Sequence, residues 1–355
     1  MNARTTLLPM ALALLTSAIA QTPRIVVQGG GAPQVFTDLA AAVAAAQADD
    51  KVYLSGGAFP YTGGLVIDKP LHFIGAGIIP DSSQTTGVTT LHGSVTNAPL
   101  VILTEASGSS FTGIRFTSDW DGSVNTTSVQ FGNSAENDAP TNVVFQRCWF
   151  QRTLRLGAPP TTAATTNTVI DECVFMLNLV GENRSATVTR SIISGGIFAF
   201  YGGGLMLENS ILFSSMQNIS SGIVRNCWIR GGNSYATYDC ANTVFENNVT
   251  NCNVIAAGSP GAVDVNNIVN AAPATFFASE SNNYFEVTDD LHLAVASPGI
   301  GHSTDGTDVG IYGTSAPYKP GGVPYNPHYR DADIAPATNP NGELPVSIRV
   351  AAQTN

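Results

Sequence analysis

The chain has 355 residues, of which 12% are charged, and its formal net charge is −11 with an isoelectric point near 4.7. This length suits a solenoid, which grows by adding coils, better than one globular domain. The hydrophobic content of 43% argues against a disordered chain. Basic runs are missing, which argues against a nucleic-acid partner.

The first twenty residues have the features of a signal peptide. Arg4 supplies a positive charge, residues 7–15 form an apolar stretch, and residues 18–20 read Ala-Ile-Ala, a small-x-small cleavage site. We therefore expect a mature chain that begins at Gln21 and is secreted, extracellular or periplasmic. The apolar stretch is shorter than the roughly 20 residues of a membrane-spanning helix, so we expect no membrane span.

Residues 37–47 are rich in alanine and predict a short helix. Thr37 or Asp38 is placed to cap its N-terminus. Because the open end of a stack of parallel strands must be covered, we expect this helix to lie over the first coil. Short strands are predicted to follow at residues 51–54, 65–67 and 71–74.

A six-residue pattern recurs through the middle of the chain: apolar, x, x, small or polar, x, apolar. Its fourth positions are residues 114, 148, 173, 191, 210, 227 and 248. Apart from the first, the intervals are of similar length, which is the signature of stacked coils. Positions two and three should form a bend, where Gly and Asn tolerate a left-handed backbone, and positions four and six should face the core. Trp149 and Trp228, at position five, are expected to point outward or into a flanking layer.

Cys148, Cys173 and Cys227 occupy fourth positions. We expect them in a buried column of small side chains, since a free cysteine behaves as a small hydrophobe. A thiol ligand cluster or a nucleophile is the alternative. Export implies an oxidising compartment, in which an odd count of five cysteines leaves at least one that is free or pairs between chains. Cys240 and Cys252 are the expected disulfide pair, because parallel Cβ directions make a bond between Cys148 and Cys173 awkward.

Two stretches carry a resemblance to a known family. Residues 35–77, VFTDLAAAVAAAQADDKVYLSGGAFPYTGGLVIDKPLHFIGAG, resemble the N-terminal portion of pectin lyase-like β-helix proteins. Residues 291–313 resemble the closing motif of secreted bacterial β-helix repeat proteins of the Bacteroidetes type. With the repeat, the resemblance implies an all-β, right-handed parallel β-helix over residues 21–314. Residues 315–355 are expected to form a Pro-rich, extended C-terminal tail, with a last strand near residues 344–350.

The catalytic motifs of the family's enzymes are missing. Residues 195–202 are the nearest match to a pectin methylesterase site, and they lack its carboxylate. The acidic motifs of polygalacturonases, which supply the acid and the base, are also missing. The resemblance therefore implies a fold without implying a reaction.

Two acidic stretches have the spacing of cation-binding loops. Asp119 and Asp121 precede a glycine, and Asp305 and Asp308 flank a glycine turn. These four residues are candidate Ca²⁺ ligands, and turns held by Asx hydrogen bonds are the alternative. We expect no required cofactor, and the histidine spacing does not fit a zinc site.

Two functions remain open. One is a non-catalytic secreted or cell-surface β-helix, a monomer that binds a polysaccharide or another cell-surface component. The other is a polysaccharide lyase or glycoside hydrolase with an unrecognised site, whose substrate could be acidic. We favour the first because no catalytic set is recognisable. Acids that converge with Arg or Lys in one groove would favour the enzyme, whereas a groove of Ser, Asn and aromatic residues would favour binding.

Overall fold

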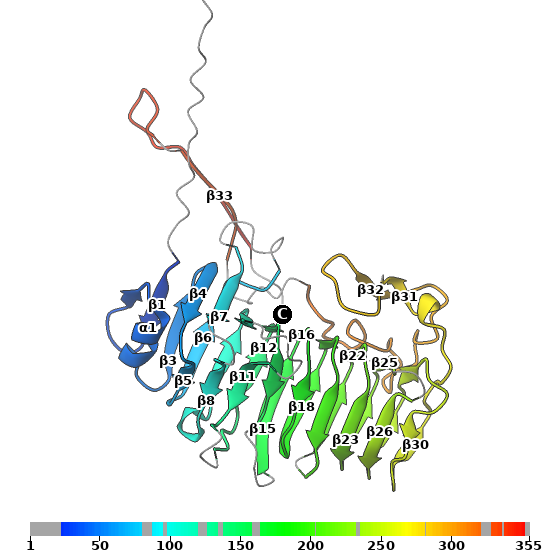
Figure 1. The fold of residues 1–355 in the computed structure, drawn as a ribbon. Coiled ribbons are helices and arrows are strands. Elements are labelled where there is room, and N and C mark those ends of the chain that lie inside the picture. Colours follow the sequence, from blue (N-terminus) through cyan, green and yellow to red (C-terminus); the bar gives the residue numbers. More distant parts are fainter. Residues whose placement is uncertain are drawn as a thin grey trace, which may run out of the picture.

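The computed structural model describes residues 23–79, 87–94, 98–119, 126–133, 138–157, 164–202, 204–231, 235–280, 282–320, 328–335 and 337–351. The chain forms an all-β parallel solenoid, in which three sheets run along one axis (Figure 1). Sheet A has twelve strands, and sheets B and C have nine strands each. The predicted fold class is confirmed.

The strands follow one another around the coils in the order A, B, C. Sheet A contains β1 (Ile25–Gln28), β2 (Gln34–Phe36), β3 (Asp50–Leu54), β6 (Leu71–Ile74), β9 (Ser110–Thr112), β12 (Val144–Gln146), β15 (Ala164–Asp171), β18 (Arg184–Thr189), β21 (Leu205–Glu208), β24 (Ile223–Arg225), β27 (Val244–Glu246) and β30 (Val263–Val265). Sheet B contains β4 (Gly57–Tyr61), β7 (Thr89–Gly93), β10 (Arg115–Ser118), β13 (Trp149–Phe150), β16 (Val174–Phe175), β19 (Ile192–Ile193), β22 (Ile211–Leu212), β25 (Trp228–Ile229) and β28 (Val249–Thr250). Sheet C contains β5 (Leu65–Ile67), β8 (Leu100–Ile102), β11 (Thr127–Phe131), β14 (Thr153–Arg155), β17 (Leu179–Val180), β20 (Ile197–Phe200), β23 (Met216–Ser220), β26 (Thr237–Ala241) and β29 (Ala256–Ala257).

The N-terminal end of the stack is covered, as the sequence predicts. Helix α1 (Leu39–Ala45) lies within the predicted range, and Asp38 is its cap: the side chain accepts a hydrogen bond from Ala41 N at 2.7 Å. The helix packs against β1, β2 and β4. Strand β1 pairs antiparallel with β3 on one side and with the edge strand β2 on the other, so two antiparallel pairings precede the parallel coils of sheet A.

Inward-facing side chains stack from coil to coil. Phe111 stacks on Phe73 at 5.0 Å and on Phe145 at 5.2 Å between ring centroids. Phe150 in sheet B stacks on Phe175 at 4.7 Å. These distances follow the spacing of about 4.8 Å between neighbouring strands, so each coil repeats the core contacts of the one before.

The corner between sheets A and B has the predicted left-handed bend. Its third-position residues have positive φ angles: 68° at Gly113, 53° at Arg147, 52° at Glu172, 45° at Arg190, 46° at Asn209, 57° at Asn226 and 53° at Asn247. Each bend turns the chain from a strand of sheet A into the next strand of sheet B. The bend therefore recurs at the same place in successive coils.

The fourth-position column is buried, and it also forms hydrogen bonds between coils. Cys173 N donates to Ser191 Oγ at 3.1 Å, and Ser191 N donates to Ser210 Oγ at 3.1 Å. Cys227 N donates to Asn248 Oδ1 at 3.0 Å. A buried N–H without an acceptor would cost about 1–3 kcal/mol, so the small polar side chains of this corner ladder stabilise the turns at which they accept such a bond.

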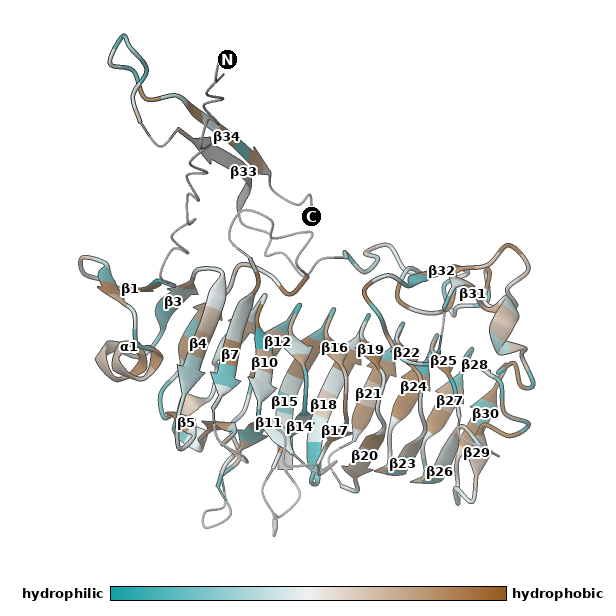
Figure 2. Cartoon of the chain, turned by 45° about the horizontal axis from the view of Figure 1, so that its top comes forward, coloured by the Kyte–Doolittle hydropathy of each residue, from teal (hydrophilic) through white to brown (hydrophobic). Residues whose placement is uncertain are grey.

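From β13 to β28, sheet B is buried on both of its faces. Its outward residues form a second apolar cluster with the C-terminal segment, which includes η3 (Pro273–Thr275), β31 (Phe277–Ser279) and β32 (Asp290–Leu293). Trp228 stacks on Phe276 at 4.0 Å, and Trp149 lies 5.7 Å from Phe285 between ring centroids. The flanking layer expected over the two tryptophans is therefore present, and Figure 2 shows this segment along one side of the solenoid.

The C-terminal tail forms a hairpin. Strand β33 (His328–Ile334) pairs antiparallel with β34 (Val346–Ala351), close to the strand expected at residues 344–350. In the described part of the chain these two strands pair only with each other. No helix among the described residues is long and apolar enough to cross a membrane.

Substituting Ser191 with alanine tests the corner ladder. Ser191→Ala leaves the buried Cys173 N–H without its acceptor, so we expect the free energy of unfolding to fall by about 1–3 kcal/mol. The exposed Ser315 is a matched control, and Ser315→Ala should change stability by less than about 0.5 kcal/mol. Urea denaturation of both variants measures the difference, and equal stabilities would rule out the ladder.

Candidate functional site

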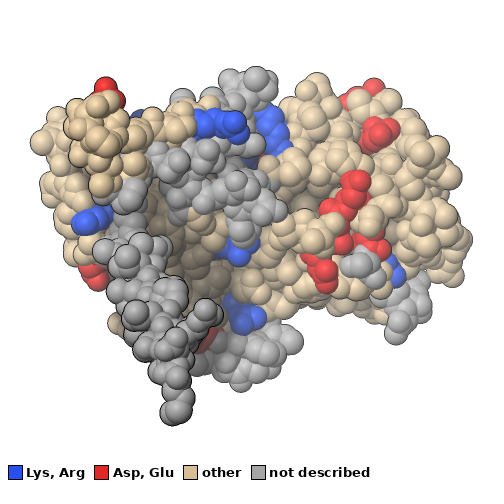
Figure 3. All heavy atoms as spheres, turned by 90° about the horizontal axis from the view of Figure 1, so that it is seen from above, with Lys and Arg blue, Asp and Glu red and all other residues tan. Residues whose placement is uncertain are grey.

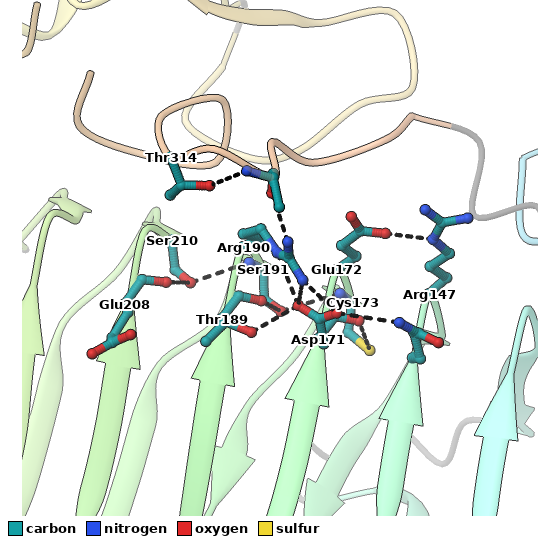
Figure 4. A network of polar contacts seen from close by, with 12 residues as sticks. Arg147, Asp171, Glu172, Cys173, Thr189, Arg190, Ser191, Glu208, Ser210 and Thr314 are labelled. Carbon is teal, nitrogen blue, oxygen red and sulfur yellow. Dashed lines mark hydrogen bonds and ion pairs between the residues drawn. The ribbon is translucent and has the colours of Figure 1, made fainter. Parts of the chain in front are cut away.

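Charged side chains replace Gly and Asn at the A–B corner in the central coils (Figure 4). Arg147 and Glu172 are buried and form an ion pair through Arg147 Nε. In the next coil, Arg190 Nη2 donates to both carboxylate oxygens of Asp171 at 2.7 Å. Left-handed backbone costs a bulky L-residue about 1–2 kcal/mol, so these residues are held in place by their surroundings.

The same corner anchors the C-terminal segment. Arg190 Nη1 donates to the carbonyl oxygen of Ala316 at 2.6 Å. Asn226 makes two bonds with Thr304, from Nδ2 to Oγ1 at 3.0 Å and from Thr304 N to Oδ1 at 2.9 Å. Asn247 Nδ2 donates to the carbonyl oxygen of His302 at 2.6 Å. The side chains at the bends therefore fasten the layer that covers sheet B.

A groove of about 390 Å³ lies between this corner and the C-terminal segment. It is lined by Thr189, Arg190, Glu208, Asn209, Arg225, Asn226, Thr304, Asp305 and Thr314. Two acids and two arginines therefore converge in one groove, which is the arrangement expected of an enzyme. Glu208 is already engaged, however, because its Oε1 lies 2.5 Å from Arg225 Nη2.

Asp305 is suited to act as an anion, because hydrogen bonds hold it ionised. Its Oδ1 accepts from Thr307 Oγ1 at 2.6 Å and from Thr307 N at 3.0 Å, and these bonds lower the pKa of Asp305. A glycosidase acid must instead carry a proton near neutral pH, which needs a raised pKa. Asp305 can therefore accept hydrogen bonds from a ligand in the groove, but it does not suit the role of general acid.

The predicted Ca²⁺ ligands lie in two separate places. Asp308 Oδ1 accepts from Gly301 N at 2.9 Å, so Asp308 and Asp305 both bond the backbone of the closing motif, as in the Asx alternative. Asp119 lies 3.4 Å from His92 Nε2, and Asp121 lies outside the described residues. Within the described ranges, no three His, Cys, Asp or Glu side chains converge on one point. Calcium binding stays a prediction.

None of the five cysteines forms a disulfide bond, and all five are buried. The expected pair of Cys240 and Cys252 is wrong, because Cys240 lies in β26 of sheet C whereas Cys252 follows β28 of sheet B. Burial raises the pKa of Cys227 to about 12 and that of Cys240 to about 11. Burial likewise raises the pKa of Cys173, which favours the column of small side chains over a reactive thiol.

A separate aromatic patch lies on the outward face of sheet C. The rings of Tyr235 and Tyr238 are exposed and stacked, with 5.4 Å between centroids and 29° between planes. Backbone register aligns Tyr238 with Gln217 and Phe198 in the two preceding coils. The sheet C patch consists of Phe198, Ala199, Gln217, Asn218, Tyr235, Tyr238 and Asp239.

Backbone strain coincides with this patch. Ala199, Asn218 and Asp239 have φ angles of 65°, 60° and 52°, one in each of three consecutive coils. These residues directly follow Phe198, Gln217 and Tyr238, respectively. Two successive side chains in each strand therefore lie away from the core. Non-glycine residues in this region cost about 1–3 kcal/mol and cluster at functional sites. The left-handed residue in each coil therefore adds one more outward side chain to the sheet C patch.

Sequence reasoning missed both the charged corner and the patch. Arg147, Glu172 and Arg190 stand at third positions where Asn or Gly is expected, and this departure was the available signal. Tyr235 and Tyr238 had no comparable signal, because the six-residue pattern covers only the bend between sheets A and B.

Comparisons with known proteins do not assign the chain to a family. A scan against protein-family models finds no match, and a search of curated proteins finds none. The likeness to pectin lyase-like proteins is therefore supported only as far as the parallel solenoid.

Removing one partner of the buried ion pair should be costly. Glu172→Ala leaves the Arg147 side chain buried without its carboxylate, which should lower the free energy of unfolding by about 3–5 kcal/mol. The double variant Arg147→Met, Glu172→Leu removes both charges and should recover most of that loss. Thermal denaturation compares the variants, and a double variant as unstable as Glu172→Ala would contradict this account of the pair.

Thiol titration tests the burial of the cysteines. Since burial raises the pKa of Cys227 and Cys240 to about 12 and 11, both groups are protonated at pH 8 and only lose the proton far above it. We expect a thiol-specific disulfide reagent to leave the native protein unmodified at pH 8 and to modify all five cysteines after unfolding. Rapid labelling of any cysteine in the native protein would show that its thiol is accessible to solvent and would contradict its burial.

Proposed function

We propose that the protein is an exported β-solenoid that binds a neutral polysaccharide through the sheet C patch without catalysing a reaction. The observation that carries the proposal is the exposed, stacked pair of Tyr235 and Tyr238, which lie just before and within β26 of sheet C. Exposed aromatic faces offer an apolar platform with a polar edge, which suits the C–H face of a sugar ring.

The flanking side chains fit the hydroxyl groups of a sugar. Gln217 and Asn218 carry both donors and acceptors, and Asp239 carries acceptors only. Successive coils are about 4.8 Å apart, so a polymer that runs along the solenoid axis meets three consecutive coils of the patch. The arrangement favours a linear chain over a single small molecule.

The charge of the protein argues for a neutral ligand. The patch contains one carboxylate, Asp239, and no Lys or Arg. Seen from above, Asp and Glu side chains gather on the side where β31 and β32 lie (Figure 3). With a formal net charge of −11, the protein should repel an acidic polymer at low salt.

The proposed location is extracellular or periplasmic. Its support is the signal-peptide pattern of residues 1–20, which lie outside the described residues. Buried thiols suit an oxidising compartment, because a structural cysteine that is buried is inert. N-terminal sequencing of the exported protein should give Gln21 as the first residue, and an uncleaved cytoplasmic product would refute export.

Affinity electrophoresis through gels that contain soluble neutral glucans, xylans or mannans tests the binding proposal. At least one polymer should retard the protein, and Tyr238→Ala should weaken that affinity about tenfold or more, equivalent to about 1.4 kcal/mol. Tyr238→Phe keeps the ring and should retain most of the affinity. Val265→Ala, at an exposed position in β30 of sheet A, is the control. Unchanged retardation of Tyr238→Ala would exclude the patch.

A second candidate function is a polysaccharide hydrolase or lyase that acts in the corner groove. The observation that favours it is the convergence of Glu208 and Asp305 with Arg190 and Arg225. Incubation with neutral and acidic polysaccharides, assayed for reducing ends and unsaturated products, tests this candidate. Turnover that is lost in Glu208→Gln and Asp305→Asn but kept in Asp239→Asn would establish the enzyme and overturn our preference.

A further inference from the structure

A cavity of about 320 Å³ lies between the outward face of sheet B and the C-terminal segment that covers it. Its apolar wall comes from both sides: Ile192 belongs to β19, whereas Phe285 and Leu291 belong to the covering segment. The volume lies near the lower end of the range for small-molecule sites, which is about 300–1,000 Å³. The cavity shares no lining residue with the corner groove, and the patch of tyrosines lies on sheet C. It is therefore distinct from both.

Acidic side chains gather on one side of this cavity. Asp289 and Asp290 line it, and among the described residues no Lys or Arg does so. Asp290 Oδ1 lies 2.6 Å from His292 Nδ1 and accepts from His292 N at 3.1 Å. An ionised carboxylate only accepts hydrogen bonds, so Nδ1 carries a proton, and these bonds lower the pKa of Asp290. Asp290 therefore keeps its negative charge at neutral pH.

An aromatic ring adjoins this carboxylate. Tyr312 also lines the cavity, and its ring stacks on that of His292 with 3.8 Å between centroids and 4° between planes. Burial and the charge of Asp290 raise the pKa of Tyr312 to about 12, so its phenol stays neutral. Tyrosine rings attract a cation that lies within about 6 Å of their centroid. Two kinds of group that attract a cation therefore lie side by side in an otherwise apolar cavity.

A buried hydroxyl group in the cavity wall lacks a partner. Tyr318 is 5% exposed, and its ring lies 6.0 Å from that of Tyr312 between centroids. Among the described residues, no group forms a hydrogen bond with Tyr318 Oη. A buried polar group without a bond costs about 1–3 kcal/mol and is rare in native proteins. The unpartnered hydroxyl therefore points to a ligand independently of the two acids.

We propose that the cavity binds a small organic amine, with its ammonium group at Asp290 and Tyr312 and its apolar body against Ile192 and Leu291. A carboxylate without a basic neighbour attracts a cation and repels an anion. The apolar wall favours a hydrocarbon body, which a metal ion lacks, and no three metal-ligating side chains converge in the described part of the chain. The site does not rest on the polysaccharide proposal, because the two share no residue.

A series of probes with similar shape and different charge tests the ligand class. Phenethylamine carries an ammonium group at pH 7, 2-phenylethanol is neutral, and 3-phenylpropanoate is an anion. In isothermal titration calorimetry at low salt, we expect saturable binding of phenethylamine with a dissociation constant below about 1 mM. The alcohol should bind at least about tenfold more weakly, and the anion should not bind. A protein that does not bind the amine, or that binds the alcohol as tightly, would overturn the proposal.

Substituting Asp290 tests the position of the ammonium group. Asp290→Asn removes the charge, keeps an oxygen that accepts from His292, and lies at an exposed position, so the fold should persist. We expect it to weaken phenethylamine binding about tenfold and to leave the binding of 2-phenylethanol unchanged. Asp68→Asn removes the same charge from an exposed position outside the cavity and should change neither affinity. Equal losses in the two variants, or no loss in Asp290→Asn, would contradict the site.

Discussion

A hydrogen bond between a small side chain of one coil and a backbone amide of the preceding coil recurs at the corner of sheets A and B. Ser191, Ser210 and Asn248 each accept such a bond. The left-handed bend at this corner leaves an amide inside the core, away from the ladder of either sheet. The corner ladder gives that amide an acceptor, and the apolar residues on either side can then stack at the strand spacing.

The arrangement of the corner also decides which faces of the solenoid remain open. Side chains at the third positions leave the core, and Arg190, Asn226 and Asn247 use this direction to hold the C-terminal segment. That segment covers the outward face of sheet B and buries Trp149 and Trp228. Sheet C lies away from these anchors, so its tyrosines keep an exposed face that can meet a ligand.

Much of the fold could be predicted because it repeats. The fourth positions identify the buried column, and Asp38 before an alanine run identifies the capping helix. Pairings between coils could not be predicted, because they depend on the sheet that each residue enters: Cys240 and Cys252 lie in consecutive coils but in different sheets. The ion pair of Arg147 and Glu172 could not be predicted for a similar reason, because it depends on the length of the coil that separates the two residues.

The candidate site was less predictable than the fold. The acidic loop residues Asp305 and Asp308 looked like cation ligands by spacing, yet their oxygens accept bonds from nearby amides, a use that spacing alone does not distinguish. The sheet C patch depends on the stacking of two tyrosines and on residues with positive φ angles such as Asn218. No local sequence pattern predicts either feature.

Hydrogen exchange at the corner amides is the most direct test of the ladder on which this structure depends. The amide protons of Cys173, Ser191 and Cys227 should exchange only through global unfolding, with the same free energy as denaturant unfolding, because each donates to a buried acceptor. Exchange of these three amides as fast as that of exposed turn amides would show that the corner opens independently, and it would contradict the ladder.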